Sequence, residues 1–189
     1  MKTFNLWPTT MMVHEVEDEE LMSESLAFLI TNRKELVNKE NKKSCILENG
    51  PLKQLKEKVF LPAFDKYLQE TCNRKLDDWS YNLNGWLASY GEGQSLNYHN
   101  HRGSQLSSVL YMMADSEDDG GDIMFTDPRQ NANRGYDLHF SNWFESFRLK
   151  PKCGQLVVFP SFLYHYVETY RSNIRMALPV DCFLQNKHK

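Results

Sequence analysis

Residues 98–113 read YHNHRGSQLSSVLYMM, with two histidines one residue apart ahead of an apolar run. Side chains at positions i and i+2 of a β-strand point to the same face of the sheet. If this stretch is extended, His99 and His101 therefore project together, and imidazole is a common ligand of Fe, Zn, Cu, Mn and Ni. We interpret the pair as two ligands of one metal ion. The alternative is a pair of solvated loop residues.

A third histidine stands in residues 154–178, which read GQLVVFPSFLYHYVETYRSNIRMAL. His165 follows an apolar strand and a turn that begins with proline, so it is a further candidate ligand, with a buried core histidine as the alternative. Ten residues later Arg175 lies in an apolar run, where a guanidinium is costly to bury unless it meets an anion. We expect that anion to be a bound ligand. The alternative is an internal salt bridge to one of three acidic residues, Asp122, Asp127 or Glu168.

The pattern of the chain changes near Trp79. Before it, residues 16–36 and 52–73 carry apolar side chains at mostly helical spacing, and Pro62 is expected to kink or divide the second helix. After it, short β-rich segments alternate with Gly and Pro, which is typical of a sandwich or barrel. We predict a mainly β jelly roll with a supporting N-terminal helical layer. We expect a single domain over residues 1–189, with its helical part at about 14–77 and its β core at about 79–185.

The composition is that of an ordinary soluble globular protein, and the net charge of −3 provides no basic field for nucleic acid or an anionic membrane. No apolar run approaches the roughly 20 residues that span a bilayer, and the N-terminus does not read as a signal peptide. The four cysteines are far apart in the sequence, which favours free thiols in a reducing cytoplasm. We therefore expect a cytoplasmic protein without nucleic-acid or membrane partners. Two-fold symmetric dimers are the most common soluble oligomers, which favours a homodimer.

Several segments together resemble the iron(II)- and 2-oxoglutarate-dependent oxygenases, and in particular an uncharacterised bacterial and phage branch of that superfamily. The resemblance extends over most of the chain. Its segments are FNLWPTTMMV, WSYNLNGWLASYGEGQSLNYHNH, LSSVLYMM, GGDIMFTDPR and GQLVVFPSFLYHYVETY with the arginine that follows. It implies a double-stranded β-helix (cupin-like) with N-terminal helices, a cytoplasmic location in a bacterium or phage-infected cell, and an oxidoreductase that uses Fe(II), 2-oxoglutarate and O2.

The resemblance also implies roles for single residues. His99 and His165 correspond to iron ligands, and Arg175 to the residue that grips the distal carboxylate of 2-oxoglutarate. Tyr111 stands where members often place a tyrosine that binds the same carboxylate. The implied reaction hydroxylates a C–H bond of a small molecule or a peptidyl or free amino acid side chain, with succinate and CO2 as co-products.

The chain departs from the superfamily at one position, because the usual motif is His-x-Asp and the second residue here is His101. His101 is expected to be the third ligand. Alternatively, it lies behind the ligands and Asp122 or Asp127 supplies a carboxylate.

Two other functions remain open: a three-histidine cupin-type dioxygenase that does not use 2-oxoglutarate, and a non-catalytic jelly-roll module that binds a metal or ligand. The long segment 127–150 is expected to form a lid or a substrate surface.

Overall fold

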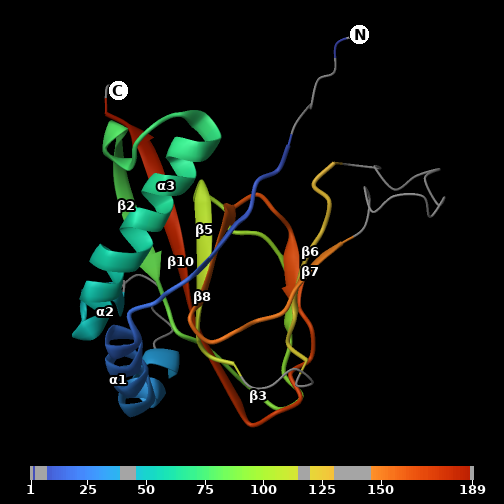
Figure 1. The fold of residues 1–189 in the computed structure, drawn as a ribbon. Helices are drawn as coiled ribbons and strands as arrows, with labels where there is room; N and C mark the ends of the chain where they lie inside the picture. Colours follow the sequence, from blue (N-terminus) through green and yellow to red (C-terminus); the bar gives the residue numbers. More distant parts are fainter. Residues whose placement is uncertain (1, 3–7, 39–45, 115–119, 130–145, 188–189) are drawn as a thin grey trace, which may run out of the picture.

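The computed structural model describes residues 2, 8–38, 46–114, 120–129 and 146–187. Its strands form two antiparallel sheets, with the helices packed against one of them (Figure 1). The helices are α1 (Glu19–Asn38), α2 (Pro51–Leu55) and α3 (Leu61–Cys72), with short turns η1 (Ile46–Glu48), η2 (Lys56–Phe60) and η3 (Leu76–Asp78). The strands are β1 (Met12–Glu15), β2 (Trp79–Gly85), β3 (Ala88–Gly91), β4 (Leu96–His99), β5 (Leu106–Met113), β6 (Ile123–Phe125), β7 (Phe147–Leu149), β8 (Gln155–Pro160), β9 (His165–Val167) and β10 (Ile174–Asn186).

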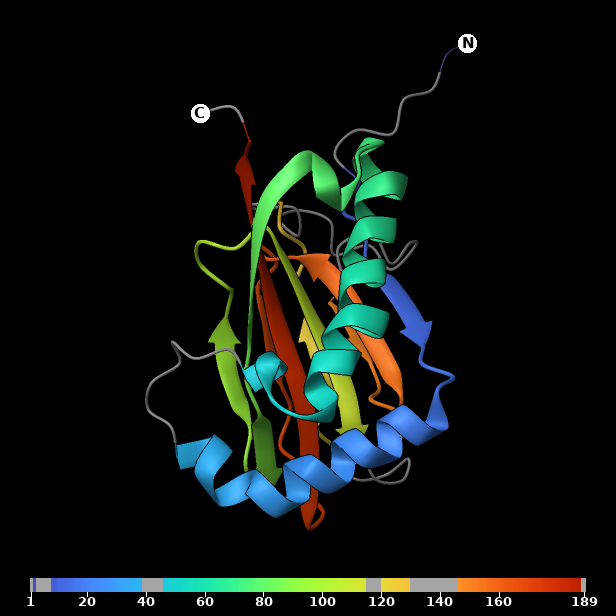
Figure 2. The ribbon, with the colours of Figure 1, turned by 90° about the vertical axis from the view of Figure 1, so that its left-hand side faces the viewer.

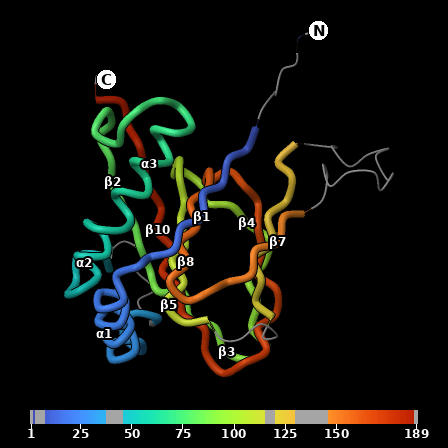
Figure 3. Tube along the Cα trace, in the orientation of Figure 1, coloured from blue at the N-terminus to red at the C-terminus, as the bar shows by residue number. Residues whose placement is uncertain are grey.

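The large sheet has the order β1-β8-β5-β10-β2, and β3 also pairs with β10. The small sheet has the order β4-β9-β6-β7. The long strand β10 runs through the large sheet between β5 and the strands β2 and β3 (Figure 3). Two facing antiparallel sheets of this kind form a jelly roll, so the predicted mainly β fold is confirmed.

The helices cover the outer face of the large sheet (Figure 2). Their buried side chains, among them Leu29, Phe60 and Phe64, form one core with the outward-facing residues of that sheet. Pro62 lies at the start of α3, directly after the π-helical turn η2. Proline has no N–H to donate within a helix, and the helical backbone changes here from a π turn to an α turn without a break, so Pro62 marks this change and the predicted division is not seen.

A second core lies between the two sheets. The side chains of β10 point alternately into this core and into the first one. Met176, Leu178 and Val180 pack toward the helices, whereas Ala177 packs into the core between the sheets. Successive side chains of a strand point to opposite faces. The odd-numbered positions of β10, including Arg175 and Asp181, therefore face the inside of the jelly roll, where they line a cavity.

Strand β1 is an addition to the predicted elements, because it places a short N-terminal segment on the edge of the large sheet beside β8. Cys72, Cys153 and Cys182 are free thiols, as predicted, whereas Cys45 lies outside the described residues. Among the helices of the described segments, none combines the length and the apolar character that crossing a membrane requires.

Candidate active site

The three histidines converge between the two sheets. His99 is the last residue of β4 and His165 the first residue of β9, and the two are paired across the ladder of the small sheet. The ring centroids are 4.3 Å apart for His99 and His165, 5.3 Å for His99 and His101, and 5.2 Å for His101 and His165. One nitrogen atom from each ring lies within 4.8 Å of the others. This spacing is one in which three side chains can share a metal ion.

His101 was predicted on the same strand as His99, but it reaches the cluster from the loop that follows β4. β4 ends at His99, and His101 lies in the loop that leads to β5. Its backbone N–H donates to the carbonyl oxygen of Ser161 at 3.1 Å, which fixes the loop against the end of β8. The two histidines therefore meet because of this loop contact rather than because they alternate along one strand.

The Nδ1 atom of each ring is engaged with an oxygen atom. Nδ1 of His99 lies 2.7 Å from the carbonyl of Asn97, and Nδ1 of His165 lies 3.0 Å from the carbonyl of Leu163. Nδ1 of His101 lies 2.7 Å from a carboxylate oxygen of Asp181. An Nδ1–H that donates to such an oxygen leaves Nε2 with its lone pair, which is the form of imidazole that binds metals.

Burial favours the neutral form of the His99 and His165 rings. It lowers the pKa of His165 to about 3, an effect that the nearby rings of His99 and His101 strengthen. It also lowers the pKa of His99 below its usual value. A metal ion competes with protons for the imidazole nitrogen, so a low pKa leaves both rings free to bind a metal at neutral pH.

The opposite end of the cavity holds Arg175. Its side chain is buried, with 3% of the residue exposed. The guanidinium carbon lies 4.9 Å from the ring centre of Tyr111 and 6.0 Å from that of Tyr90, and Nη1 donates to the backbone carbonyl of Gly121. Gly121 has a φ of +71°, which side-chain-bearing residues rarely adopt, and a Cβ atom there would lie 2.6 Å from Nη1 and displace the guanidinium.

Two buried polar atoms at this end have no hydrogen-bond partner within the described residues, the Tyr111 hydroxyl and Arg175 Nε. Burial raises the pKa of Tyr111 to about 12, although the charge of Arg175 opposes the rise, so the phenol stays protonated and able to donate. Unpaired buried donors are costly, and both of these would be satisfied by an anionic ligand in the cavity.

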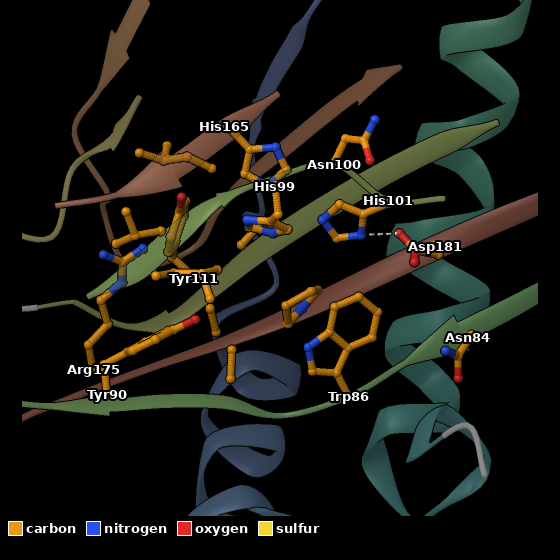
Figure 4. A pocket seen from close by; sticks show the side chains of 17 residues that line it. Asn84, Trp86, Tyr90, His99, Asn100, His101, Tyr111, His165, Arg175 and Asp181 are labelled. Carbon is orange, nitrogen blue, oxygen red and sulfur yellow. Dashed lines mark ion pairs between the residues drawn. The ribbon is translucent and has the colours of Figure 1, made fainter. Parts of the chain in front are cut away.

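A single cavity of about 330 Å³ connects the histidines to Arg175 (Figure 4). Trp86 and Asn100 lie at the histidine end, and the Trp86 ring stacks on His101 with 5.7 Å between ring centroids. Apolar side chains from both sheets also line the cavity: Leu96, Val109, Ile123, Val167 and Ala177. The volume suits a small molecule that binds the histidine cluster at one end and the arginine at the other.

The acidic residues considered as partners are engaged elsewhere. Asp122 and Glu168 accept from Arg148 at 3.0 and 2.9 Å, and Asp127 accepts from Arg129. Within the described segments, Arg175 forms no ion pair, and no acidic residue has an oxygen atom in the histidine cluster. The structure therefore does not support the internal salt bridge, nor a ligand role for Asp122 or Asp127.

Sequence reasoning missed Asp181, Trp86 and Tyr90 as cavity residues. Asp181 could have been found, because it lies six residues after Arg175 and an even separation on one strand places both side chains on the same face. The segment 127–150, expected to be a lid or substrate surface, lies largely outside the described residues, which contain only 127–129 and 146–150 of it.

The model of a protein family described as "Putative 2OG-Fe(II) oxygenase" matches residues 84–181, which is just over half of the 189-residue chain. The chain belongs to this family. It is therefore an oxidoreductase of the 2-oxoglutarate- and Fe(II)-dependent oxygenases, as the sequence resemblance predicted. The matched range contains the three histidines, Tyr111, Arg175 and Asp181.

Solved structures share the fold of this oxygenase. A prolyl-4-hydroxylase from Pseudomonas putida is 18% identical, with 94% of each chain covered and a TM-score of 0.66. A prolyl hydroxylase from Trichoplax adhaerens, in complex with a hypoxia inducible factor peptide fragment, is 14% identical, with 92% of this chain and 83% of that chain covered and a TM-score of 0.63. The viral collagen prolyl hydroxylase from Paramecium Bursaria Chlorella virus-1, as a 2OG complex, is 14% identical, with 91% of this chain and 94% of that chain covered and a TM-score of 0.55. No curated protein matches the sequence.

Proposed function

We propose that this oxygenase hydroxylates a C–H bond of a peptidyl or free amino acid side chain, with His99, His101 and His165 as ligands of Fe(II). Arg175 and Tyr111 hold the distal carboxylate of 2-oxoglutarate. The proposal rests on one observation. A single cavity contains three imidazoles and a buried arginine that lacks an ion-pair partner in the described part of the chain.

The side chains fit both groups. Imidazole suits iron, and the engaged Nδ1 atoms leave Nε2 of each ring for the metal. A carboxylate at the far end would accept from Arg175 Nε and the Tyr111 hydroxyl, the two buried donors without partners. When bound, iron(II) supplies the chemistry by which O2 and 2-oxoglutarate become succinate, CO2 and a hydroxyl group on the substrate.

The protein residues position and shield these reactants. Arg175 and Tyr111 set the position of the co-substrate, because their donors lie at the end of the cavity away from His101 (Figure 4). The apolar side chains that line the cavity exclude water from the reacting groups. The stacked pair of Trp86 and His101 borders the part of the cavity near the metal ligands, where a substrate side chain would lie.

A peptidyl substrate is supported by the structural neighbours, which include prolyl hydroxylases and one complex with a peptide fragment. Their identity to this chain is low, so the proposal extends to the class of substrate and not to a particular peptide. Peptides that contain proline are the first substrates to test.

The test measures 2-oxoglutarate binding and succinate formation with Fe(II) under controlled oxygen. We expect the Arg175→Met variant to bind 2-oxoglutarate about 100-fold more weakly, since hydrogen bonds to a charged group contribute about 1.5–3 kcal/mol each. Its affinity for Fe(II) alone should be unchanged. Arg148→Met, the same substitution at an exposed arginine of the small sheet, is the matched control and should bind 2-oxoglutarate normally.

The same measurement separates this proposal from a three-histidine cupin-type dioxygenase. That reading explains the ligand set but leaves Arg175 and Tyr111 without a role. If the Fe(II)-loaded wild-type protein binds no 2-oxoglutarate and forms no succinate with any peptide or amino acid tested, the proposed function is wrong and the cupin-type reaction is favoured.

A further inference from the structure

Asp181 is a buried carboxylate at the metal end of the cavity, and the proposed ligand set does not include it. It is 8% exposed, and the basic residue that contacts it within the described residues is His101, whose Nδ1 lies 2.7 Å from Oδ1 of Asp181. A carboxylate is costly to bury without a positive partner. We infer that Asp181 is a positioning residue that orients His101 and supplies through it the negative charge which a ligand carboxylate supplies in the usual His-x-Asp motif. This inference rests on the proposed metal site.

The contacts of the three rings distinguish His101 from the other two. His99 and His165 each hold Nδ1 against a backbone carbonyl two residues earlier, and a carbonyl carries no net charge. His101 alone holds Nδ1 against a carboxylate. A carboxylate on the far nitrogen of an imidazole fixes its tautomer and orientation and makes it a more basic ligand.

The net charge of the proposed metal site supports the same role for Asp181. Three neutral imidazoles would leave the full +2 charge of Fe(II) at the site, whereas two histidines and a carboxylate would reduce it by one unit. Asp181 restores that unit of charge one imidazole away from the metal. The histidine at position 101, where the usual motif has Asp, is thereby offset by a carboxylate on β10 that contacts this histidine.

A chain of serine hydroxyls holds the carboxylate in place. Ser107, which is paired with Asp181 across the strands, donates to Asp181 Oδ1 at 2.7 Å. Ser107 and Ser161 are joined at 2.8 Å, and Ser104 donates to Ser161 at 2.8 Å. The carbonyl of Ser161 also accepts the N–H of His101. The same small group of residues therefore fixes both partners of the pair, as a preorganised site requires.

The test uses Co(II) alone as the probe, titrated into the full-length protein and followed by its visible absorption spectrum. Asp181→Asn keeps the shape and an oxygen acceptor but removes the charge, and Asp181→Ala removes both. We expect affinity losses of about 10-fold for Asp181→Asn and up to about 100-fold for Asp181→Ala, the range known for partners behind a ligand. The absorption bands of bound Co(II) should also shift, which a merely structural role would not produce.

Asp122→Asn is the matched control, because Asp122 is also a buried carboxylate but pairs with Arg148 instead of a histidine. It should leave the affinity and the Co(II) spectrum unchanged. Ser107→Ala, which loosens Asp181 without touching the ring, should give a smaller loss and keeps the test decisive if Asp181→Ala does not fold.

The outcomes separate this inference from the proposed function. Tight Co(II) binding by the wild type together with unchanged affinity and spectrum in Asp181→Asn would overturn the inference about Asp181 alone. Absence of saturable Co(II) binding by the wild type would overturn the metal site and the inference with it.

Discussion

The two sheets of this oxygenase differ in how they are covered. The inner strands β5 and β8 of the large sheet are buried almost throughout, because the helices pack on their outer face and the small sheet faces the other side. The small sheet has short strands and an exposed outer face, where the rings of Tyr98 and Tyr164 stack at 57% and 42% exposure. Two of the proposed iron ligands stand on this thinner sheet.

The residues that stabilise the fold and the residues that form the candidate site lie in different regions. The buried apolar side chains that stabilise the fold lie mainly between the helices and the large sheet, away from the cavity. The inner face of the large sheet carries Tyr111, Arg175 and Asp181. The Tyr111 hydroxyl and Arg175 Nε have no hydrogen-bond partner within the described residues, and Asp181 is bound to His101 and Ser107. A stable sheet thus holds one end of the site rigid while the small sheet brings His99 and His165 to it.

The largest expected effect is the loss of metal binding on removal of a ligand from the small sheet. His165→Ala should abolish Fe(II) and Co(II) binding, a loss beyond the roughly 100-fold known for partners behind a ligand. The free energy of unfolding of the metal-free protein should change little. Calorimetric metal titration and thermal unfolding measure the two effects, with His14→Ala on exposed β1 as the control. Full metal affinity in His165→Ala would remove this residue from the ligand set.

The reverse pattern is expected on the helical side of the large sheet. Phe64 of α3 is fully buried there, and Phe64→Ala should lower the free energy of unfolding by about 3–5 kcal/mol because it leaves a cavity. Metal affinity should persist at temperatures where the variant is folded. Denaturant unfolding checks this, with the exposed neighbour Lys66→Ala as a control that should stay within about 0.5 kcal/mol. A parallel loss of metal affinity would show that the two regions are coupled.

The smallest effect is expected at the inner face of the large sheet. Tyr111→Phe removes a buried hydroxyl without a described partner, so stability should be unchanged or slightly higher. The Kd for 2-oxoglutarate should rise about tenfold, since one hydrogen bond to a carboxylate is lost. Tyr81→Phe, at an exposed tyrosine of β2, is the control. A marked fall in stability with no change in 2-oxoglutarate affinity would assign Tyr111 a structural role.

Much of the fold could be predicted because local patterns specify it. The apolar spacing of residues 16–36 and 52–73 predicted helices that the structure contains, and the short β-rich segments after Trp79 predicted the sheets. The same apolar, β-rich segments also placed Arg175 and Tyr111 on strands, although they did not tell which face was inside. The edge strand β1 was missed, since four residues carry too little pattern to distinguish a strand from a loop.

The sequence by itself indicated the family, the three histidines and the arginine, because these depend on residue types and on motifs that can be recognised along the chain. Only the tertiary structure decided the partners. Asp181 meets Ser107, 74 residues earlier, and reaches His101 from a different element, whereas Asp122 is drawn to Arg148 across the small sheet. Strand order and register bring such residues together, and no local periodicity encodes that order, so which carboxylate stands behind a histidine could be read only from the folded chain.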